Sequence, residues 1–199
     1  MVMIDSRGAG FDEALALTDK TAEQMNLSRR EAFHLRLLAE ETLGMLRAIT
    51  GDYTAEFRVE TEGRTCRIYL SAKSDLDYAK RKELLNVSTT GKNAARVGIM
   101  EKIRGIFEAG LFSLEEGYNL QSQYGASMFT YGTMGMLEPG ISDAVYAWSM
   151  QKYKAGVQAE NDPDAWDELE KSIIANIADD VTVGVRRGSV ELVITKIYR

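Results

Sequence analysis

The stretch Thr54–Ala72 (TAEFRVETEGRTCRIYLSA) decides the fold class of this chain. It contains two runs, Thr54–Thr61 and Arg64–Ala72, in which apolar and polar residues alternate. The dipeptide Glu62-Gly63 separates them, and this arrangement predicts a β-hairpin with a tight turn. Because side chains alternate across a strand, each strand has one apolar face. The residues on these faces are Phe57 and Val59 in the first strand and Cys66, Ile68 and Leu70 in the second.

Two predicted helices precede this hairpin. The first spans about Asp12 to Met25 and carries apolar residues at helical spacing. The second begins at Ser28, since its hydroxyl and the Glu31 carboxylate have capping-box spacing, and it runs to about Ile49. Helices with one apolar stripe cover the apolar face of a sheet, so this part of the chain predicts a helix layer packed on strands.

A polar loop and a further helix follow the hairpin. The helix is expected over Ala94–Ala109, and the loop leads directly into it. The loop offers hydroxyls, a glycine and a lysine just before the start of a helix, and these groups suit a phosphate. A loop that binds nothing is an equal alternative. The loop residues are Ser88, Thr89, Thr90, Gly91, Lys92 and Asn93.

The C-terminal region predicts one more helix and a second hairpin. Asp162 and Pro163 form an N-cap and N1 pair, and the helix should end near Ala178. Val181–Val185 and Ser189–Ile197 then form the hairpin. Hairpins and helices without strict βαβ alternation predict an α+β fold, a two-layer α/β sandwich with a mixed or antiparallel sheet covered by helices. The helix should bury the stripe Trp166, Leu169, Ile173 and Ile177.

We expect residues 1–199 to form a single domain, with residues 111–160 as an insertion or accessory segment. No Lys or Arg occurs between Arg104 and Lys152, where aromatic residues, Gly and Met gather. One interpretation is a packed insertion with a turn at Pro139 and a helix over Ile141–Lys154. The other is a docking or dimer surface from Phe112 to Trp148, since Met and aromatic side chains are typical of interfaces.

Composition limits the classes of function. The chain has 199 residues, of which 45% are hydrophobic and 27% charged, as in an ordinary globular protein. Its net charge of −6 argues against nonspecific nucleic-acid binding, and no long apolar run predicts a membrane span. A lone Cys66 and a start without the basic and apolar runs of a signal peptide predict a cytoplasmic protein.

Two motifs resemble those of the ATPase superfamily of gyrase and histidine kinases (the GHKL type). Leu37–Met45 resembles its first motif, in which a Glu is followed four residues later by a magnesium-binding Asn. Glu41 matches the Glu, and Met45 stands in the place of the Asn. Arg96–Ile103, which contains Gly98, resembles the end of the nucleotide lid and the helix after it. Within the superfamily the chain is most similar to the anti-sigma-factor serine kinases.

This resemblance implies a histidine kinase-like ATPase fold with an ATP site that lacks parts of the family pattern. Glu41 would be the catalytic general base, and ATP would bind to the loop of residues 88–93 and to Gly98. The family's Asp-x-Gly-x-Gly motif would fall at Ser71–Asp77, which has no Gly. Met45 offers a thioether where Mg²⁺ needs oxygen, so we expect nucleotide binding without efficient turnover. If the chain is active, the resemblance implies an ATP-dependent serine kinase.

The resemblance also implies a protein partner, either a sigma factor or an antagonist of one, and a homodimer. The alternative function is a protein-interaction module that binds no nucleotide and docks through the aromatic, Met- and Gly-rich segment. Glu41 then has a simpler interpretation as a solvated carboxylate. His34, the only histidine, is assigned no role, and no metal site is expected. A pair such as Asp179-Asp180 more often caps a helix end or makes a turn than binds a cation.

Overall fold

A computed structural model describes residues 1–49, 53–74, 99–112, 146–186 and 189–199, and these residues build an α+β fold around one sheet. In the described chain the sheet has six strands in the order β1-β2-β3-β6-β5-β4, and every neighbouring pair is antiparallel. The α+β class and an antiparallel sheet are therefore confirmed. The strands are β1 (Val2–Asp5), β2 (Tyr53–Glu62), β3 (Thr65–Ser74), β4 (Tyr146–Ser149), β5 (Asp180–Arg186) and β6 (Ser189–Ile197).

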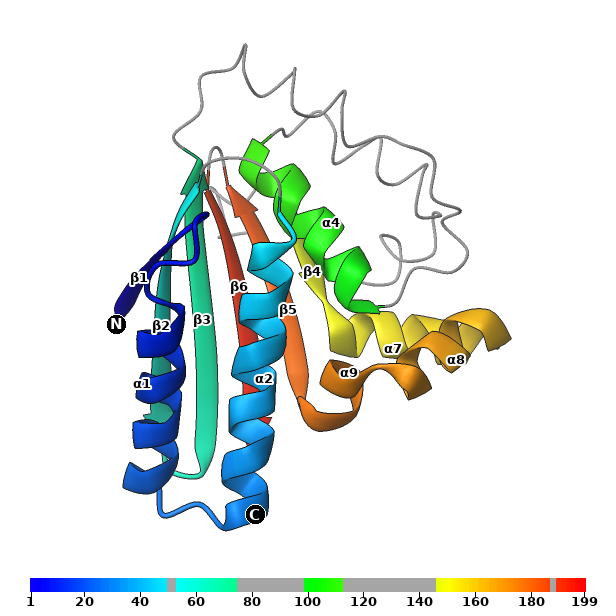
Figure 1. Ribbon diagram of the computed structural model, residues 1–199. Helices are drawn as coiled ribbons and strands as arrows, with labels where there is room; N and C mark the ends of the chain where they lie inside the picture. Colours follow the sequence, from blue (N-terminus) through cyan, green and yellow to red (C-terminus); the bar gives the residue numbers. More distant parts are fainter. Residues whose placement is uncertain (50–52, 75–98, 113–145, 187–188) are drawn as a thin grey trace.

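Helices cover one face of this sheet, as Figure 1 shows. The helices α1, α2 and α4 lie across the strands, while α7 and α8 extend from the β4 end. The opposite face carries partly exposed polar side chains, including Arg58, which stacks over the Tyr69 ring at 4.0 Å. The helices are α1 (Phe11–Gln24), α2 (Arg29–Arg47), α4 (Ile99–Phe112), α7 (Met150–Glu160), α8 (Pro163–Lys171) and α9 (Ile173–Ile177).

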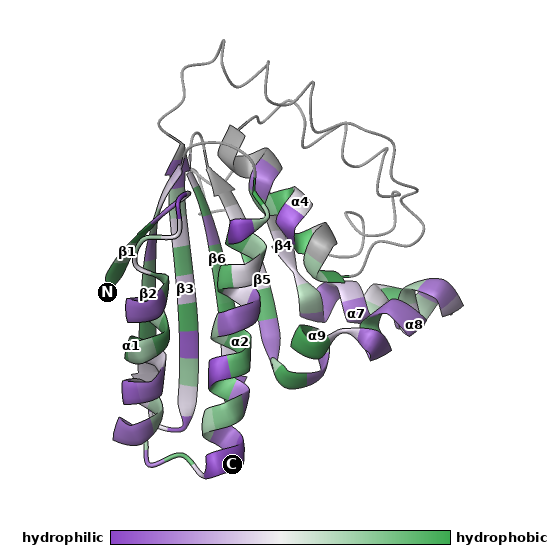
Figure 2. Cartoon of the chain, viewed as in Figure 1, coloured by the Kyte–Doolittle hydropathy of each residue, from purple (hydrophilic) through white to green (hydrophobic). Residues whose placement is uncertain are grey.

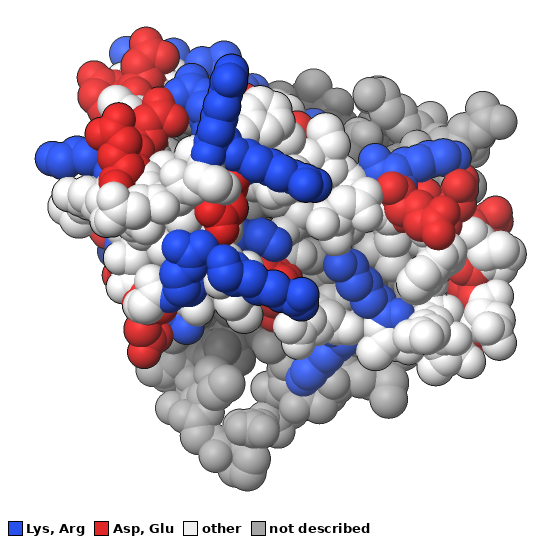
Figure 3. Space-filling model, turned by 90° about the horizontal axis from the view of Figure 1, so that it is seen from below, with Lys and Arg blue, Asp and Glu red and all other residues white. Residues whose placement is uncertain are grey.

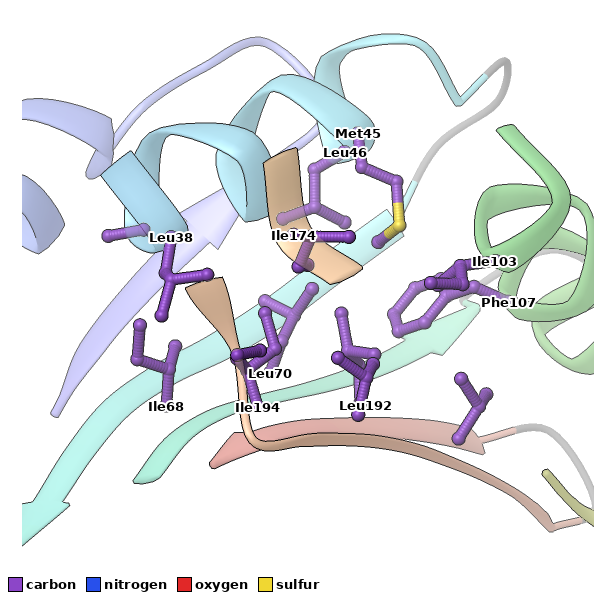
Figure 4. Close-up of a cluster of buried hydrophobic side chains, with 14 of the residues drawn as sticks. Leu38, Met45, Leu46, Ile68, Leu70, Ile103, Phe107, Ile174, Leu192 and Ile194 are labelled. Carbon is purple, nitrogen blue, oxygen red and sulfur yellow. The ribbon is translucent and has the colours of Figure 1, made fainter. Parts of the chain in front are cut away.

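The hydrophobic core lies between the sheet and the helices. Alternate residues of β3 and β6 point into it, and the hydropathy colouring of Figure 2 follows this alternation along the strands. Side chains from α2, α4 and α9 close the core from above (Figure 4). The central residues, each no more than 2% exposed, are Leu38, Leu46, Ile68, Leu70, Ile103, Phe107, Ile174, Leu192 and Ile194.

The first hairpin and the second helix form as the sequence predicts. β2 and β3 pair in the register Phe57↔Leu70, with Glu62 opposite Thr65 across the turn. At the start of α2, Ser28 N donates to Glu31 Oε2 at 2.8 Å and Glu31 N donates to Ser28 Oγ at 3.4 Å. The capping box is therefore confirmed, and α2 begins at Arg29, directly after the N-cap Ser28.

Of the helix expected over Ile141–Lys154, the structure describes residues 146–154, and the prediction is right from Met150 onward but wrong for Tyr146–Ser149. Tyr146–Ser149 forms β4, which pairs with β5, and α7 begins only at Met150. Ser149 is the N-cap of α7, and its hydroxyl accepts from Lys152 N. Aromatic residues alternate with small ones in this short run, so it suits an edge strand.

The expected single helix from Pro163 to Ala178 is also wrong. Ser172 adopts extended backbone angles (φ −82°, ψ 121°) and separates α8 from α9. The break changes which residues face the core. Ile173 is 46% exposed and Trp166 44% exposed, so neither is a core residue, while Ile174 is fully buried. Leu169 is buried as predicted.

Trp148 belongs to the core rather than to a docking surface. Its side chain is fully buried and lies against the Tyr153 ring, with 6.0 Å between the ring centroids. At Trp148 this burial agrees with the interpretation of a packed segment and not with that of a docking surface. Residues 113–145, which hold most of the aromatic and Met-rich segment, lie outside the described residues.

The end of the molecule where α2 begins carries many charged side chains, and Figure 3 shows Lys and Arg gathered there beside Asp and Glu. Arg64 contacts Glu31 at 2.8 Å, and Lys196 contacts Asp179 at 3.1 Å. Acidic groups thus accompany the basic ones at this end. No helix in the described part of the chain is long and apolar enough to cross a membrane.

Candidate functional site

A pocket of about 300 Å³ lies where α2 meets α4. Both helices stand on the same face of the sheet and contact each other near the end of α2. Residues one helical turn apart share a helix face, and this spacing lets each helix supply a wall. The described lining residues are Glu40, Glu41, Gly44, Met45 and Ala48 from α2 and Met100 and Arg104 from α4.

Glu41, predicted from the sequence, lies in this pocket. Its side chain is partly buried, and no group in the described part of the chain forms a hydrogen bond or ion pair with its carboxylate. The neighbouring Glu40 differs, because Arg36 Nε donates to Glu40 Oε1 at 2.9 Å. Arg36 also pairs with Asp19 on α1. Glu41 is thus the pocket carboxylate left available for a ligand, a proton or a cation.

Met45 and Met100 give the pocket an apolar wall. Met45 is 5% exposed, and in Figure 4 its thioether points from α2 toward α4. Thioether sulfur is soft and polarizable, and it adapts to flat ring systems. It is a poor ligand for Mg²⁺, which prefers oxygen. This wall therefore suits an apolar or aromatic group better than a metal ion.

Arg104 supplies positive charge to the pocket from α4. The sequence analysis did not single it out, because its role depends on α4 packing against α2. One signal was present: Met100 and Arg104 are four residues apart in the predicted helix and therefore share a face. The pocket thus brings together two carboxylates, a guanidinium and two thioethers.

The remaining predicted site residues are not placed by the structure. Ser88, Thr89, Thr90, Gly91, Lys92, Asn93 and Gly98 lie outside the described residues. The helix expected over Ala94–Ala109 is described from Ile99 onward, where it forms α4. Of the predicted site residues, Glu41 alone lies in the part of the chain that the structure describes.

Asp179 and Asp180 have structural partners. Asp180 Oδ1 accepts from Gln151 N at 3.1 Å and from Val181 N at 2.8 Å, which joins the start of α7 to β5. Asp179 Oδ2 accepts from Ile197 N at 2.7 Å. These contacts tie the pair to the start of α7 and to the strands β5 and β6, whereas the helix before it, α9, ends at Ile177 with Ala178 as its C-cap. No cluster of three or more metal-ligating side chains occurs among residues that the structure describes.

Cys66 is buried on β3, and burial raises the pKa of its thiol to about 12. The thiolate is the reactive form of cysteine, so this residue is inert in the folded chain.

Comparisons with protein families, with curated proteins and with solved structures found no match for this chain.

Proposed function

We propose that this chain is a regulatory protein with a histidine kinase-like ATPase fold, similar to the anti-sigma-factor serine kinases. In this proposal the pocket between α2 and α4 binds an adenine nucleotide without efficient turnover. The supporting observation is that Glu41, which matches the motif glutamate in sequence, lines a pocket together with the residue four positions later, Met45.

The chemistry of the pocket supports a nucleotide. Small-molecule sites are mostly apolar cavities of roughly 300–1,000 Å³ with a few polar groups that orient the ligand. Here the thioethers of Met45 and Met100 would supply the apolar contacts to the nucleotide. The Arg104 guanidinium would attract the phosphates, since it is a fixed positive charge with several donors.

The same residues argue against efficient turnover. Phosphoryl transfer needs charge neutralisation on the phosphates, which Mg²⁺ usually supplies. Met45 replaces the oxygen ligand of the family pattern, so a Mg²⁺ site would lack one protein ligand. Glu41 could still act as general base on a water or a hydroxyl, but phosphoryl transfer would remain slow without a complete Mg²⁺ site. We therefore propose that nucleotide binding changes how the protein binds a partner, either a sigma factor or an antagonist of one.

Calorimetric titration with ATP and ADP, each with and without Mg²⁺, tests this proposal. We expect binding that depends weakly on Mg²⁺, and a ligand at 100 times its Kd should stabilise the fold by about 2.7 kcal/mol. Arg104→Gln should weaken binding, whereas Glu41→Gln should preserve it because the carboxylate is not needed to hold the ligand. Glu13→Gln, on the exposed side of α1, is the charge-matched control.

Two results would contradict the proposal. If millimolar ATP and ADP produce neither heat nor thermal stabilisation, the pocket does not bind nucleotide. If phosphate is released rapidly with Mg²⁺, and Glu41→Gln stops this release, the site turns over and the claim of slow chemistry is wrong.

A further inference from the structure

A second pocket, of about 310 Å³, lies between α7 and α8, away from the α2–α4 site. The chain turns there at Asn161, whose left-handed backbone (φ 52°) ends α7, and Asp162 caps the start of α8. Trp166 on the first turns of α8 forms one wall and is 44% exposed. The described lining residues are Val157, Gln158, Asn161, Asp162, Pro163 and Trp166.

The surroundings of this pocket are strongly acidic. Residues 160–171 carry six carboxylates and one amine, Lys171. Figure 2 shows α8 mostly in hydrophilic colours. An excess of one charge sign around a pocket attracts ligands of the opposite sign and raises their rate of association. A ligand for this pocket should therefore be cationic.

Trp166 is held in a position to contact such a cation. Its indole Nε1 donates to Glu170 Oε1 at 2.9 Å, which fixes the ring against α8. A cation over an indole face is attracted by the negative face of the ring, and Trp is the strongest partner of this kind. Glu170 accepts the indole hydrogen at the ring edge, so this bond covers neither face of the ring.

Asp162 adds a carboxylate beside the ring. Its Oδ1 accepts from Asp164 N and from Ala165 N, both at 3.1 Å, as the N-cap of α8. Its Oδ2 accepts no hydrogen bond from any residue of the described chain. A planar guanidinium can stack on an aromatic ring and donate to a carboxylate together, whereas an ammonium cannot form both contacts with the same geometry.

Two basic side chains of these helices have partners outside the pocket. Lys154 Nζ donates to Ala175 O at 2.6 Å, which ties α7 to α9. Lys171 pairs with Asp167 within α8. Residues 105–149, which precede α7 in the chain, contain neither Lys nor Arg and so have no cation to place in the pocket.

We propose that the α7–α8 pocket binds an arginine side chain from a basic segment of a partner protein. The guanidinium stacks on Trp166 and donates to Asp162, while the acidic residues of α8 attract the basic residues that flank it. This interaction is separate from the nucleotide site, so it can hold whether or not nucleotide binds.

Fluorescence anisotropy with a labelled peptide tests this directly. The probe is a short peptide with three arginines separated by glycine and serine, and its control carries neutral citrulline in place of each arginine. Intrinsic fluorescence gives a second measurement, since the chain has two tryptophans and Trp148 is fully buried. A change in emission on adding peptide therefore reports on Trp166.

Two variants locate the contact. Trp166→Ala should raise the Kd by about five-fold, the effect of losing a cation–π contact of ordinary strength. Asp162→Asn removes one charge but keeps a good N-cap, so α8 should stay folded. The matched controls are Phe33→Ala, an exposed aromatic residue on α2, and Asp12→Asn on α1.

The proposal is supported if the arginine peptide binds, the citrulline peptide does not, and both pocket variants weaken binding while both controls leave it unchanged. It is overturned if no peptide binds, or if Trp166→Ala binds as tightly as the wild type, which would mean attraction by surface charge alone. Analytical ultracentrifugation tests the alternative occupant, a second copy of this chain. A dimer that Trp166→Ala converts to a monomer would assign the pocket to a second copy of this chain and overturn the proposal.

Discussion

We expect substitution of Gly44 by alanine to stabilise the fold and, at the same time, to weaken ATP binding in the α2–α4 pocket. Gly44 lies within α2 and lines the pocket. A Cβ built at this position meets no heavy atom within 4 Å, so a methyl group fits without a clash. Glycine inside a helix costs about 0.5–1 kcal/mol relative to alanine.

We therefore expect Gly44→Ala to raise the free energy of unfolding by up to about 1 kcal/mol, or the unfolding temperature by about 2–4 °C for a chain of this size. The methyl group also takes up room at the pocket wall. ATP should consequently bind more weakly to this variant than to the wild type, although the variant is the more stable protein. Thermal unfolding followed by circular dichroism measures the first effect, and calorimetric titration measures the second.

Gly10→Ala is the contrasting variant. Gly10 has a left-handed backbone (φ 81°), and an added Cβ would lie 2.1 Å from the Met3 carbonyl oxygen. Strain of this kind costs about 1–3 kcal/mol, so this variant should unfold at a lower temperature. The reasoning is refuted if Gly44→Ala destabilises the protein, or if it leaves the affinity for ATP unchanged.

Three further predictions concern the fold. Ser28→Ala removes the capping box of α2 and should destabilise the chain by about 1 kcal/mol; in chemical denaturation, an unchanged midpoint would show that the cap is not needed. Burial raises the pKa of Tyr53 from its ordinary value of 10 to about 12, so its contribution to stability is complete below pH 10 and lost as the pH rises toward 12. Tyr53→Phe should reduce this alkaline loss, and denaturation at several pH values measures it. Cys66 should resist a thiol reagent at pH 8 in the folded protein and react after unfolding; rapid labelling of the native chain would contradict its burial.

Much of the fold could be predicted because local signals agree with tertiary packing. The β2–β3 hairpin has alternation and a turn glycine, and α2 has a capping box at its first turn. β1 and β4 were missed because each has only four residues and owes its conformation to pairing with a distant strand. Strand propensity in so short a run is weak compared with the tertiary context.

The break between α8 and α9 was missed for a related reason. The apolar spacing runs through Ser172, but Ser172 ends α8 and its hydroxyl accepts from Ala175 N as the N-cap of α9. A serine inside an apolar pattern can continue a helix or cap a new one, and packing decides between the two.

In the candidate site, too, some residues could be identified from local sequence and others only from tertiary packing. Glu41 could be identified from its place in a motif, because motif and helix face are both local features. Arg104 and Met100 could not, since their place in the pocket depends on how α4 packs against α2. Trp166 was assigned to the core by its spacing, yet its exposed ring forms a wall of the second pocket.

The central claim is that adenine nucleotide binds between α2 and α4, and the methionines of the chain allow a direct test. Met45 and Met100 line the pocket, whereas Met3 is 56% exposed on β1 and is the internal control. With ¹³C-methyl-labelled methionine, NMR spectra are recorded during an ATP titration, and resonances are assigned by single Met→Leu variants. Our account predicts that the methyl signals of Met45 and Met100 shift together and saturate while Met3 is unchanged. Spectra in which neither pocket methyl responds to millimolar ATP would contradict it.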